Sequence, residues 1–184
     1  MFNQFTLTDL EAVSTTQLAG VPLGSVAEVW DATYYGLKAV YCKFQAALEK
    51  VGSCIWPDTA AGDWIVDDDN DQAAGTLYLA VGAALSAAAV TDTTWYGWVL
   101  TAGFCPLVLV TDGSADAGEG LIGSASDGTW TGVAATVSVT ATTGTAYNTP
   151  AQFPATCMTA DTSNALAAGD ALFHSVYAAL PRTF

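Results

Sequence analysis

Positive charge is nearly absent from this chain. Four Lys and Arg residues face 18 Asp and Glu residues among 184, and the formal net charge is −14. A field of this sign repels nucleic-acid phosphates and anionic lipid headgroups, so we expect no direct nucleic-acid partner and no membrane partner. Lys38, Lys43 and Lys50 lie close together in the sequence. This cluster is compatible with a docking face, although solvated lysines on a strand or helix are the more common cause.

Histidine is equally scarce, because His174 is the only one. Ser175 follows it, but neighbours in sequence do not make a nucleophile and its base. GxSxG, Walker A and GxGxxG motifs are also missing. Paired carboxylates of the glycosidase kind are abundant, yet they come without any cleft signature. We therefore expect no catalytic residues, no cofactor and no enzyme activity, with an acidic hydrolase as the weakest alternative.

The cysteines lack the spacing of a metal or redox site. Cys42, Cys54, Cys105 and Cys157 form no CxxC pair, and one histidine is too few to complete a zinc site. The N-terminus has neither the basic start nor the apolar run of a secretory signal. Buried thiols are therefore predicted in preference to disulfides.

One acidic segment carries part of a calcium-binding pattern. Asp67, Asp69 and Asp71 alternate as in the first half of an EF-hand loop. Gln72 stands where that loop needs Gly, and Tyr78 stands where it needs Glu. The segment is a weak metal candidate, and a solvated acidic loop is the alternative.

Hydrophobic residues make up 52% of the chain, and the densest run is TTWYGWVLTAGFCPLVLVTDG at residues 93–113. Gly and Pro interrupt it too often for a membrane-spanning helix. We predict a core hairpin with a three-residue loop at Thr101–Gly103. Pro106 places the start of the second strand at a sheet edge or a bulge.

Further short strands are expected on both sides of this run. GLKAVYCKFQ predicts a strand at 37–45, although Val40, Phe44, Leu48 and Val51 also make a helical stripe. A helical turn at 46–52 and a short strand in SCIWPD follow. The small residues of 76–90 predict strands that another surface approaches closely. Asp127–Gly128 marks a turn between later strands.

The predicted fold is mainly β, a small antiparallel β-barrel or sandwich with an extended N-terminal arm and at most one or two short helices. The arm covers residues 1–24, with a short turn around Leu7–Val13. Residues 25–184 form a single β-rich domain with an irregular insertion at about 143–169. The sequence shows no exact internal repeat.

Two stretches resemble the capsid decoration, or cement, proteins of tailed phages. They are GWVLTAGFCPLVLVTDGSADAGEGLIGSASDGTWTGVA at 97–134 and LGSVAEVWDATYYGLKAVYCKFQAALEKVGSCIW at 23–56. The first carries a GWV hairpin followed by an AGE and SAS pattern, and the second a Gly-led turn and a Y-x-K strand. The resemblance implies a homotrimeric virion protein, made in the host cytoplasm, that binds the major capsid protein on the outside of the phage capsid and stabilises the shell.

The same resemblance implies that the arm orders on a neighbouring capsomer, and that the small residues of 80–90 pack closely against a partner. The capsid or subunit contact candidates are Phe2, Phe5, Leu7, Leu10, Trp95 and Trp98.

A carbohydrate-binding or adhesion module, with calcium in the acidic loop, is the alternative function. Trp64, Trp95, Trp98 and Trp130 would then form a sugar-stacking platform, although core or subunit packing is their more common role.

Overall fold

The described part of the chain consists mainly of β-strands. The computed structural model describes residues 5–30, 36–45, 52, 54–57, 64–68, 82–85, 95–110, 115–124, 128–133, 155–157 and 167–173. Its elements are α1 (Leu7–Glu11), β1 (Val26–Val29), β2 (Leu37–Phe44), β3 (Cys54–Pro57), β4 (Ile65–Asp67), β5 (Gly82–Ala84), β6 (Trp95–Val110), β7 (Gly120–Gly123), β8 (Trp130–Val133), β9 (Ala155–Cys157) and β10 (Ala167–Phe173). The predicted mainly β class, with one short helix, is confirmed. No helix among these residues is long and apolar enough to cross a membrane.

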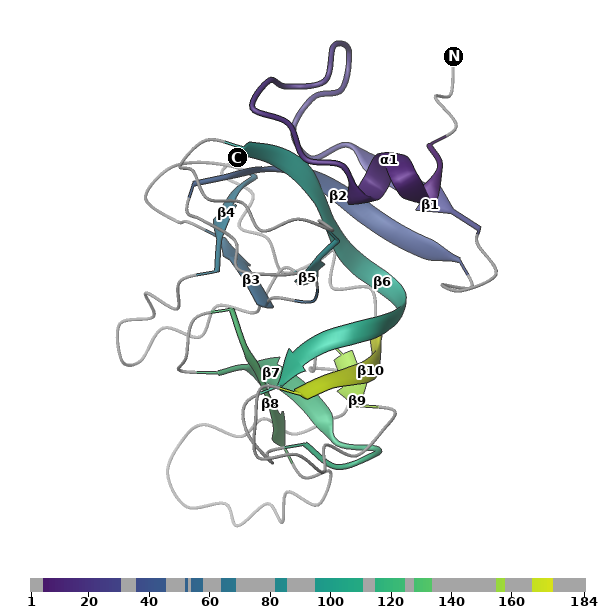
Figure 1. Ribbon diagram of the computed structural model, residues 1–184, viewed down its shortest axis with the longest axis vertical. Helices are drawn as coiled ribbons and strands as arrows, with labels where there is room; N and C mark the ends of the chain where they lie inside the picture. Colours follow the sequence, from purple (N-terminus) through teal and green to yellow (C-terminus); the bar gives the residue numbers. More distant parts are fainter. Residues whose placement is uncertain are drawn as a thin grey trace, which may run out of the picture.

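The arm folds back onto the sheet. Thr6 caps α1, because Asp9 N–H bonds to the Thr6 hydroxyl while the Asp9 carboxylate accepts the Thr6 N–H at 2.8 Å. Leu10 on this helix is buried in the core. Ser14 then forms a β-bridge with Tyr96 through two backbone hydrogen bonds of 3.0 and 2.8 Å. The predicted short turn near residues 7–13 is therefore a helix that covers the outer face of the sheet (Figure 1).

Five strands close into a first ring. β2 pairs with β4, β4 with β3, β3 with β5, β5 with the first half of β6, and β6 again with β2. Only the β2–β4 pair is parallel. The side chains that point into this ring form one buried cluster: Val40, Cys42, Phe44, Ile55, Val66, Ala84 and Val99. The predicted strand at 37–45 is confirmed, and so is the short strand in SCIWPD.

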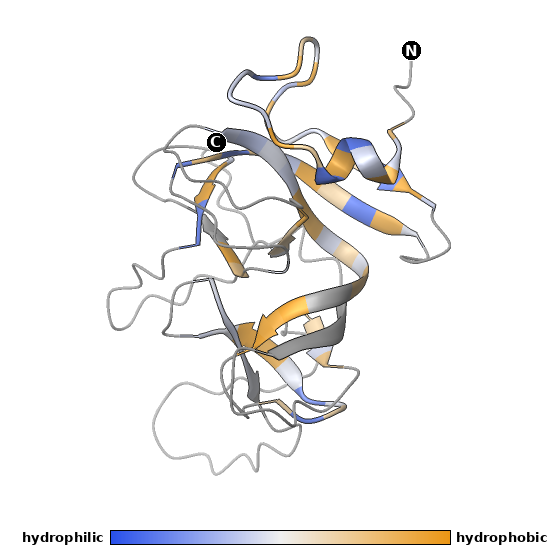
Figure 2. Ribbon diagram, in the orientation of Figure 1, coloured by the Kyte–Doolittle hydropathy of each residue, from blue (hydrophilic) through white to orange (hydrophobic). Residues whose placement is uncertain are grey.

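The second half of β6 begins a second ring. It pairs with β10, β10 with β9, β9 with β7, β7 with β8, and β8 returns to β6 through a parallel pair. The buried side chains of this ring that join one cluster are Cys105, Val108, Val110, Leu121, Trp130, Ala155 and Cys157. They belong to a larger cluster that continues beneath the arm, where Leu10 and Trp98 lie. Figure 2 shows that the end of β6, which forms part of this second ring, is hydrophobic.

The predicted hairpin at Thr101–Gly103 is wrong. Residues 95–110 form one continuous strand that curls from the first ring into the second (Figure 1). Gly103 has φ +108, a conformation open to glycine, and here it bends the strand without reversing it. Pro106 lies where the β6–β10 register shifts, so the predicted bulge is confirmed.

The two rings repeat one topology. We number the five strands of each ring in their order along the chain. In both rings, strand one pairs with strand three in parallel. The remaining pairs are antiparallel in both rings: three with two, two with four, four with five, and five with one. β6 is strand five of the first ring and strand one of the second. This structural repeat is not accompanied by an exact repeat of the sequence.

The residue register repeats as well. Gly52 and Gly118 both have left-handed φ angles, and their N–H groups donate to the matching carbonyls of Ala84 and Cys157. Three cross-strand pairs of the first ring also have equivalents in the second. Ile55–Gly82 corresponds to Leu121–Ala155, Phe44–Val66 to Val110–Trp130, and Cys42–Gly97 to Val108–Gly169.

A short junction joins the rings. Gly128 N–H donates to the Asp68 carbonyl at 2.7 Å, and Cys54 N–H donates to the Gly128 carbonyl at 2.9 Å. The Trp130 indole N–H donates to the Gly52 carbonyl at 3.1 Å. Gly128 has φ +64, as the predicted turn requires, whereas Asp127 lies outside the described residues.

Two other predicted segments are only partly described. In the small-residue stretch, a Cβ on Gly82 would lie 1.8 Å from the Leu100 carbonyl oxygen, so the predicted close approach is confirmed. The approaching surface is the protein's own β6, and Gly82–Leu85 are buried within the chain, not offered to a partner. Within 143–169, where irregular structure was expected, β9 and the start of β10 lie in the second ring. The helical turn expected at 46–52 falls outside the described residues except for Gly52.

Candidate functional site

β1 is the one described strand with a single neighbour. Each of the other described strands has partners on both edges, because it belongs to a closed ring. β1 instead extends the first ring beside β2 and leaves its second edge without a strand from the described residues. It is also absent from the repeated unit, since the second ring has no described counterpart. An element added to a repeated scaffold is a reasonable place to look for a binding surface.

The local sequence sets which side chains β1 presents. A turn with Gly24 at φ +81 and a Ser25 N–H bond to the Pro22 carbonyl leads the chain into the strand. Alternation then buries Ala27 and Val29 against the core and directs Val26, Glu28 and Trp30 outward. We call these last three residues the β1 outer face.

Trp30 dominates this face. It is 84% exposed, and Val26 is 44% exposed on the same side. The indole lies across Gly36 at the start of β2, because a Cβ at that glycine would be 3.2 Å from the ring. The absence of a side chain at Gly36 therefore lets the indole pack over the backbone there, and most of the indole surface remains exposed to solvent. Trp30 is thus the most exposed large hydrophobic residue of the described part of the chain.

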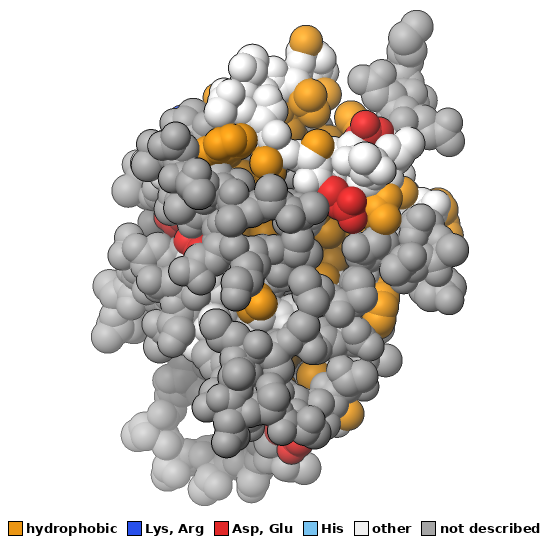
Figure 3. Space-filling view, viewed as in Figure 1, with side chains coloured by type: hydrophobic (Ala, Val, Ile, Leu, Met, Phe, Trp, Pro, Cys, Tyr) orange, Lys and Arg blue, Asp and Glu red, His pale blue; other side chains and the backbone are white. Residues whose placement is uncertain are grey.

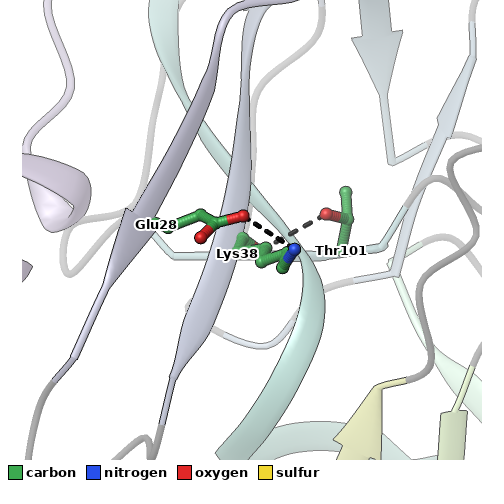
Figure 4. Close-up of polar contacts among 3 residues, drawn as sticks. All are labelled: Glu28, Lys38 and Thr101. Carbon is green, nitrogen blue, oxygen red and sulfur yellow. Dashed lines mark hydrogen bonds and ion pairs between the residues drawn. The ribbon is translucent and has the colours of Figure 1, made fainter. Parts of the chain in front are cut away.

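A charged pair lies between the two apolar residues. The Glu28 carboxylate contacts the Lys38 ammonium at 2.7 Å, with both side chains about half exposed. The Thr101 hydroxyl donates to the Lys38 carbonyl at 3.3 Å, which ties this part of β2 to β6 (Figure 4). An exposed ion pair contributes only about 0–1 kcal/mol to stability, so its main effect is to fix where Glu28 points.

The backbone of β1 faces the open edge at alternate residues. Tyr41 N–H donates to the Ser25 carbonyl, so Ser25 is hydrogen-bonded to β2. Because backbone groups alternate in direction along a strand, Ala27 and Val29 also direct their N–H and C=O groups toward β2. Val26 and Glu28 therefore direct theirs away from the ring, toward the open edge.

The contact residues predicted from the sequence lie elsewhere. Leu10 and Trp98 are buried in the protein's own core and cannot contact a partner in this arrangement. Phe5 packs edge-on against the Trp98 ring at 4.9 Å, and Leu7 also packs on this cluster. Trp95 packs against the first-ring cluster, and Phe2 lies outside the described residues. Figure 3 shows the described hydrophobic side chains of this side of the molecule gathered mainly around its upper half.

The tryptophans proposed as a sugar platform do not share a surface. Trp98 and Trp130 are buried in the core. Trp64 and Trp95 are partly buried against the first-ring cluster. Their packing role is the one that the sequence favoured, and Trp30 is the exposed tryptophan among those described.

The acidic segment remains a weak candidate. Asp67 is half-buried at the end of β4 and Asp68 is buried at the junction between the rings. Asp69, Asp71 and His174 lie outside the described residues. Within the part of the chain that the structure describes, no three His, Cys, Asp or Glu side chains are grouped as metal ligands.

The cysteines are buried and none forms a disulfide, as predicted. Burial raises the pKa of the Cys42 thiol far above its ordinary value. Burial, together with the nearby Asp68 charge, also raises the pKa of Cys54. These thiols are protonated at neutral pH, which makes them unsuited to nucleophilic chemistry.

Trp30 was missed because tryptophans in so apolar a chain were assigned to the core. The available signal was the alternation in VAEVW, where small or β-branched Ala27 and Val29 share one face and Glu28 shares the other with Trp30. A charged residue two positions before a tryptophan on a short strand indicates that the tryptophan faces solvent.

No protein-family model matches this chain, and no curated protein or solved structure is significantly similar to it.

Proposed function

We propose that this protein is a structural component of a phage virion that decorates the outer surface of the icosahedral capsid. It binds the major capsid protein and stabilises the shell by burying surface at many equivalent positions. The observation that carries the proposal is the exposed β1 outer face on an otherwise closed double ring. The resemblance of residues 97–134 and 23–56 to cement proteins supplies the identity of the partner.

The scaffold suits such a role for physical reasons. Closed rings remove strand edges that would otherwise aggregate, which a protein held at high local density on a shell requires. A net charge of −14 keeps the protein away from nucleic acid. Assembly as a homotrimer on the capsid exterior is part of the same proposal.

Co-sedimentation tests this function. Purified protein is mixed with expanded, undecorated phage heads, and the heads are pelleted. We expect stoichiometric co-pelleting and a higher temperature of head disruption. Ala117→Ser, which alters an exposed residue before β7 and outside both the arm and the β1 outer face, is the control and should pellet like the wild type. Wild-type protein that stays in the supernatant at all salt concentrations contradicts the proposal.

A carbohydrate-binding function is the second candidate, and the exposed Trp30 ring favours it, because sugars stack on open aromatic faces. A glycan array probed with wild-type protein and with Trp30→Ala separates the two. Signal that depends on Trp30 supports sugar binding, and an array without signal contradicts it.

A further inference from the structure

We propose that the open edge of β1 binds an extended, basic segment of a partner protein, which adds to the sheet as an antiparallel strand. For the identity of the partner this rests on the proposed function, since the major capsid protein would supply the segment. The chemistry of the segment comes from β1 itself. Strand addition uses backbone hydrogen bonds for affinity and alternate side chains for specificity.

The backbone supplies the first requirement. β1 has one neighbour, while each of the other described strands has a partner on both edges. Val26 and Glu28 direct their N–H and C=O groups toward the open edge, as the Ser25–Tyr41 hydrogen bond establishes. A new strand can therefore pair here without displacing any ladder between described strands.

The side chains supply the second requirement. Val26, Glu28 and Trp30 alternate apolar, acidic, apolar along the β1 outer face. In an antiparallel pair the residues directly opposite interact most strongly. The matching strand therefore carries a Lys or Arg opposite Glu28, with apolar residues two positions away on each side. Lys38 holds one side of the Glu28 carboxylate, and the incoming cation approaches from the other.

Charge decides between this partner and a second copy of the chain. A second copy carries the same excess of acidic residues, so its pairing at this edge gains no charge attraction, and the proposed homotrimer would form through other surfaces. Antiparallel pairing of two β1 strands about Glu28 would also place the two carboxylates directly opposite, which is destabilising. A basic segment gains from both features, and its binding weakens as salt screens the attraction.

Variants of one residue separate the backbone from the side chain. Glu28→Pro removes the N–H that faces the open edge and leaves the β1–β2 ladder intact. Glu28→Ala is its matched control, because it loses the same carboxylate and the same ion pair but keeps the N–H. Trp30→Ala removes the exposed indole, and its exposure means that the fold does not depend on it. Circular dichroism and thermal unfolding verify that each variant is folded.

The first measurement needs no phage heads. Heptapeptides TVTKTVT and TVTETVT are immobilised at high density, and retention of labelled full-length protein is measured at low and high salt. We expect about fivefold to tenfold greater retention on the lysine peptide, lost at high salt. Glu28→Ala should abolish the discrimination, and Glu28→Pro should abolish retention. Equal retention on both peptides, or wild-type retention by Glu28→Pro, overturns the inference. If Glu28→Pro is unfolded, undiminished retention of Trp30→Ala overturns it instead.

The second measurement uses undecorated heads and separates the two proposals. Co-pelleting of wild type and Glu28→Ala without Glu28→Pro supports both. Co-pelleting of all three keeps the decoration function and overturns strand addition. Lysine-selective peptide retention without co-pelleting overturns the decoration function and keeps strand addition. If the wild type self-associates and Glu28→Pro does not, a second copy occupies the edge and the inference is overturned. The inference is also overturned if glycan binding requires Trp30 but persists in Glu28→Pro, because the occupant is then a sugar.

Discussion

The two rings share a strand order and a register but fill their interiors differently. In the first ring the pair Phe44–Val66 places the large side chain on the first strand and the small one on the third. In the second ring the equivalent pair Val110–Trp130 reverses this order. All four side chains are buried. The same strand pairing therefore accommodates different side chains at equivalent buried positions, with the larger residue on either strand.

The rings also differ in what surrounds them. The first ring has a separate interior cluster and a second apolar layer outside it, beneath the arm. The core of the second ring belongs to that outer layer. The first ring thus has two packed layers, while the second depends on the first for part of its core. Four changes, in order of expected effect, sharpen or break this comparison.

The largest effect is expected at Gly82. Gly82→Ala places a Cβ against the Leu100 carbonyl, where there is no room, and should cost about 3 kcal/mol or more of unfolding free energy. The equivalent residue of the second ring is Ala155, and Ala155→Gly should cost only about 1 kcal/mol. Urea unfolding of both variants measures the difference. Similar costs in the two rings would contradict the assigned register.

The second-ring arrangement, a small residue on the first strand and Trp on the third, can be introduced into the first ring. Val66→Trp alone overpacks the first ring, and Phe44→Val alone leaves a cavity; each should cost about 2–3 kcal/mol. The double variant imitates the second ring and should cost less than the sum by about 1–2 kcal/mol. A double-mutant cycle in urea tests this. Additive costs would show that the two side chains do not share one volume.

Alkaline pH should act through thiols of the first ring. The pKa of Cys42 and of Cys54 is raised in the folded protein above the ordinary 9.0. Their stabilising effect is complete below pH 9.0 and is lost above it, because the unfolded thiols ionise first. Each thiol should lower the unfolding free energy by about 1.4 kcal/mol per pH unit.

Cys42→Val, which introduces the residue found at the equivalent position of the second ring, serves as the matched variant. Urea unfolding between pH 8 and about pH 11 should give it a shallower slope than the wild type. Identical slopes would argue against a buried Cys42.

The smallest effect is expected in the arm, which covers the first ring. Hydrogen bonds from Thr6 lower the pKa of Asp9 below 3.8. The stabilising effect of the cap is therefore present above pH 3.8 and is lost as the pH falls through the lowered pKa. The Thr6 amide chemical shift, followed by NMR, should titrate below pH 3.8, and Asp9→Asn should abolish the titration. A midpoint above that value would exclude the capping box.

Local sequence predicted the mainly β fold well. The β-branched and aromatic residues of 37–45 correctly predicted a strand in place of the helical alternative. The small residues near Gly82 correctly predicted that another strand, β6, packs closely against them. The hairpin failed because a glycine with positive φ can bend a strand as well as reverse it. The choice depends on pairing partners at Ala167–Phe173, far along the chain.

The ring repeat could not have been predicted from residue identities. Equivalent positions hold Ile55 and Leu121, or Val66 and Trp130, so only strand pairing reveals the correspondence. The candidate site was missed for a different reason, since the alternation in residues 26–30 was present in the sequence but the tryptophans were assigned to the core.

The shared strand has a consequence for how the chain can be divided. A polypeptide made of two modules normally tolerates a cut between them, at a linker that neither needs. Here the midpoint is β6 itself, whose residues 95–102 pair in the first ring and whose residues 103–110 pair in the second. A cut near Gly103 would therefore leave each ring its own half of β6, and the two pieces should stay together through the buried cluster that runs from the second ring to the layer beneath the arm. Separating the pieces would expose that cluster to water, so neither should remain soluble alone.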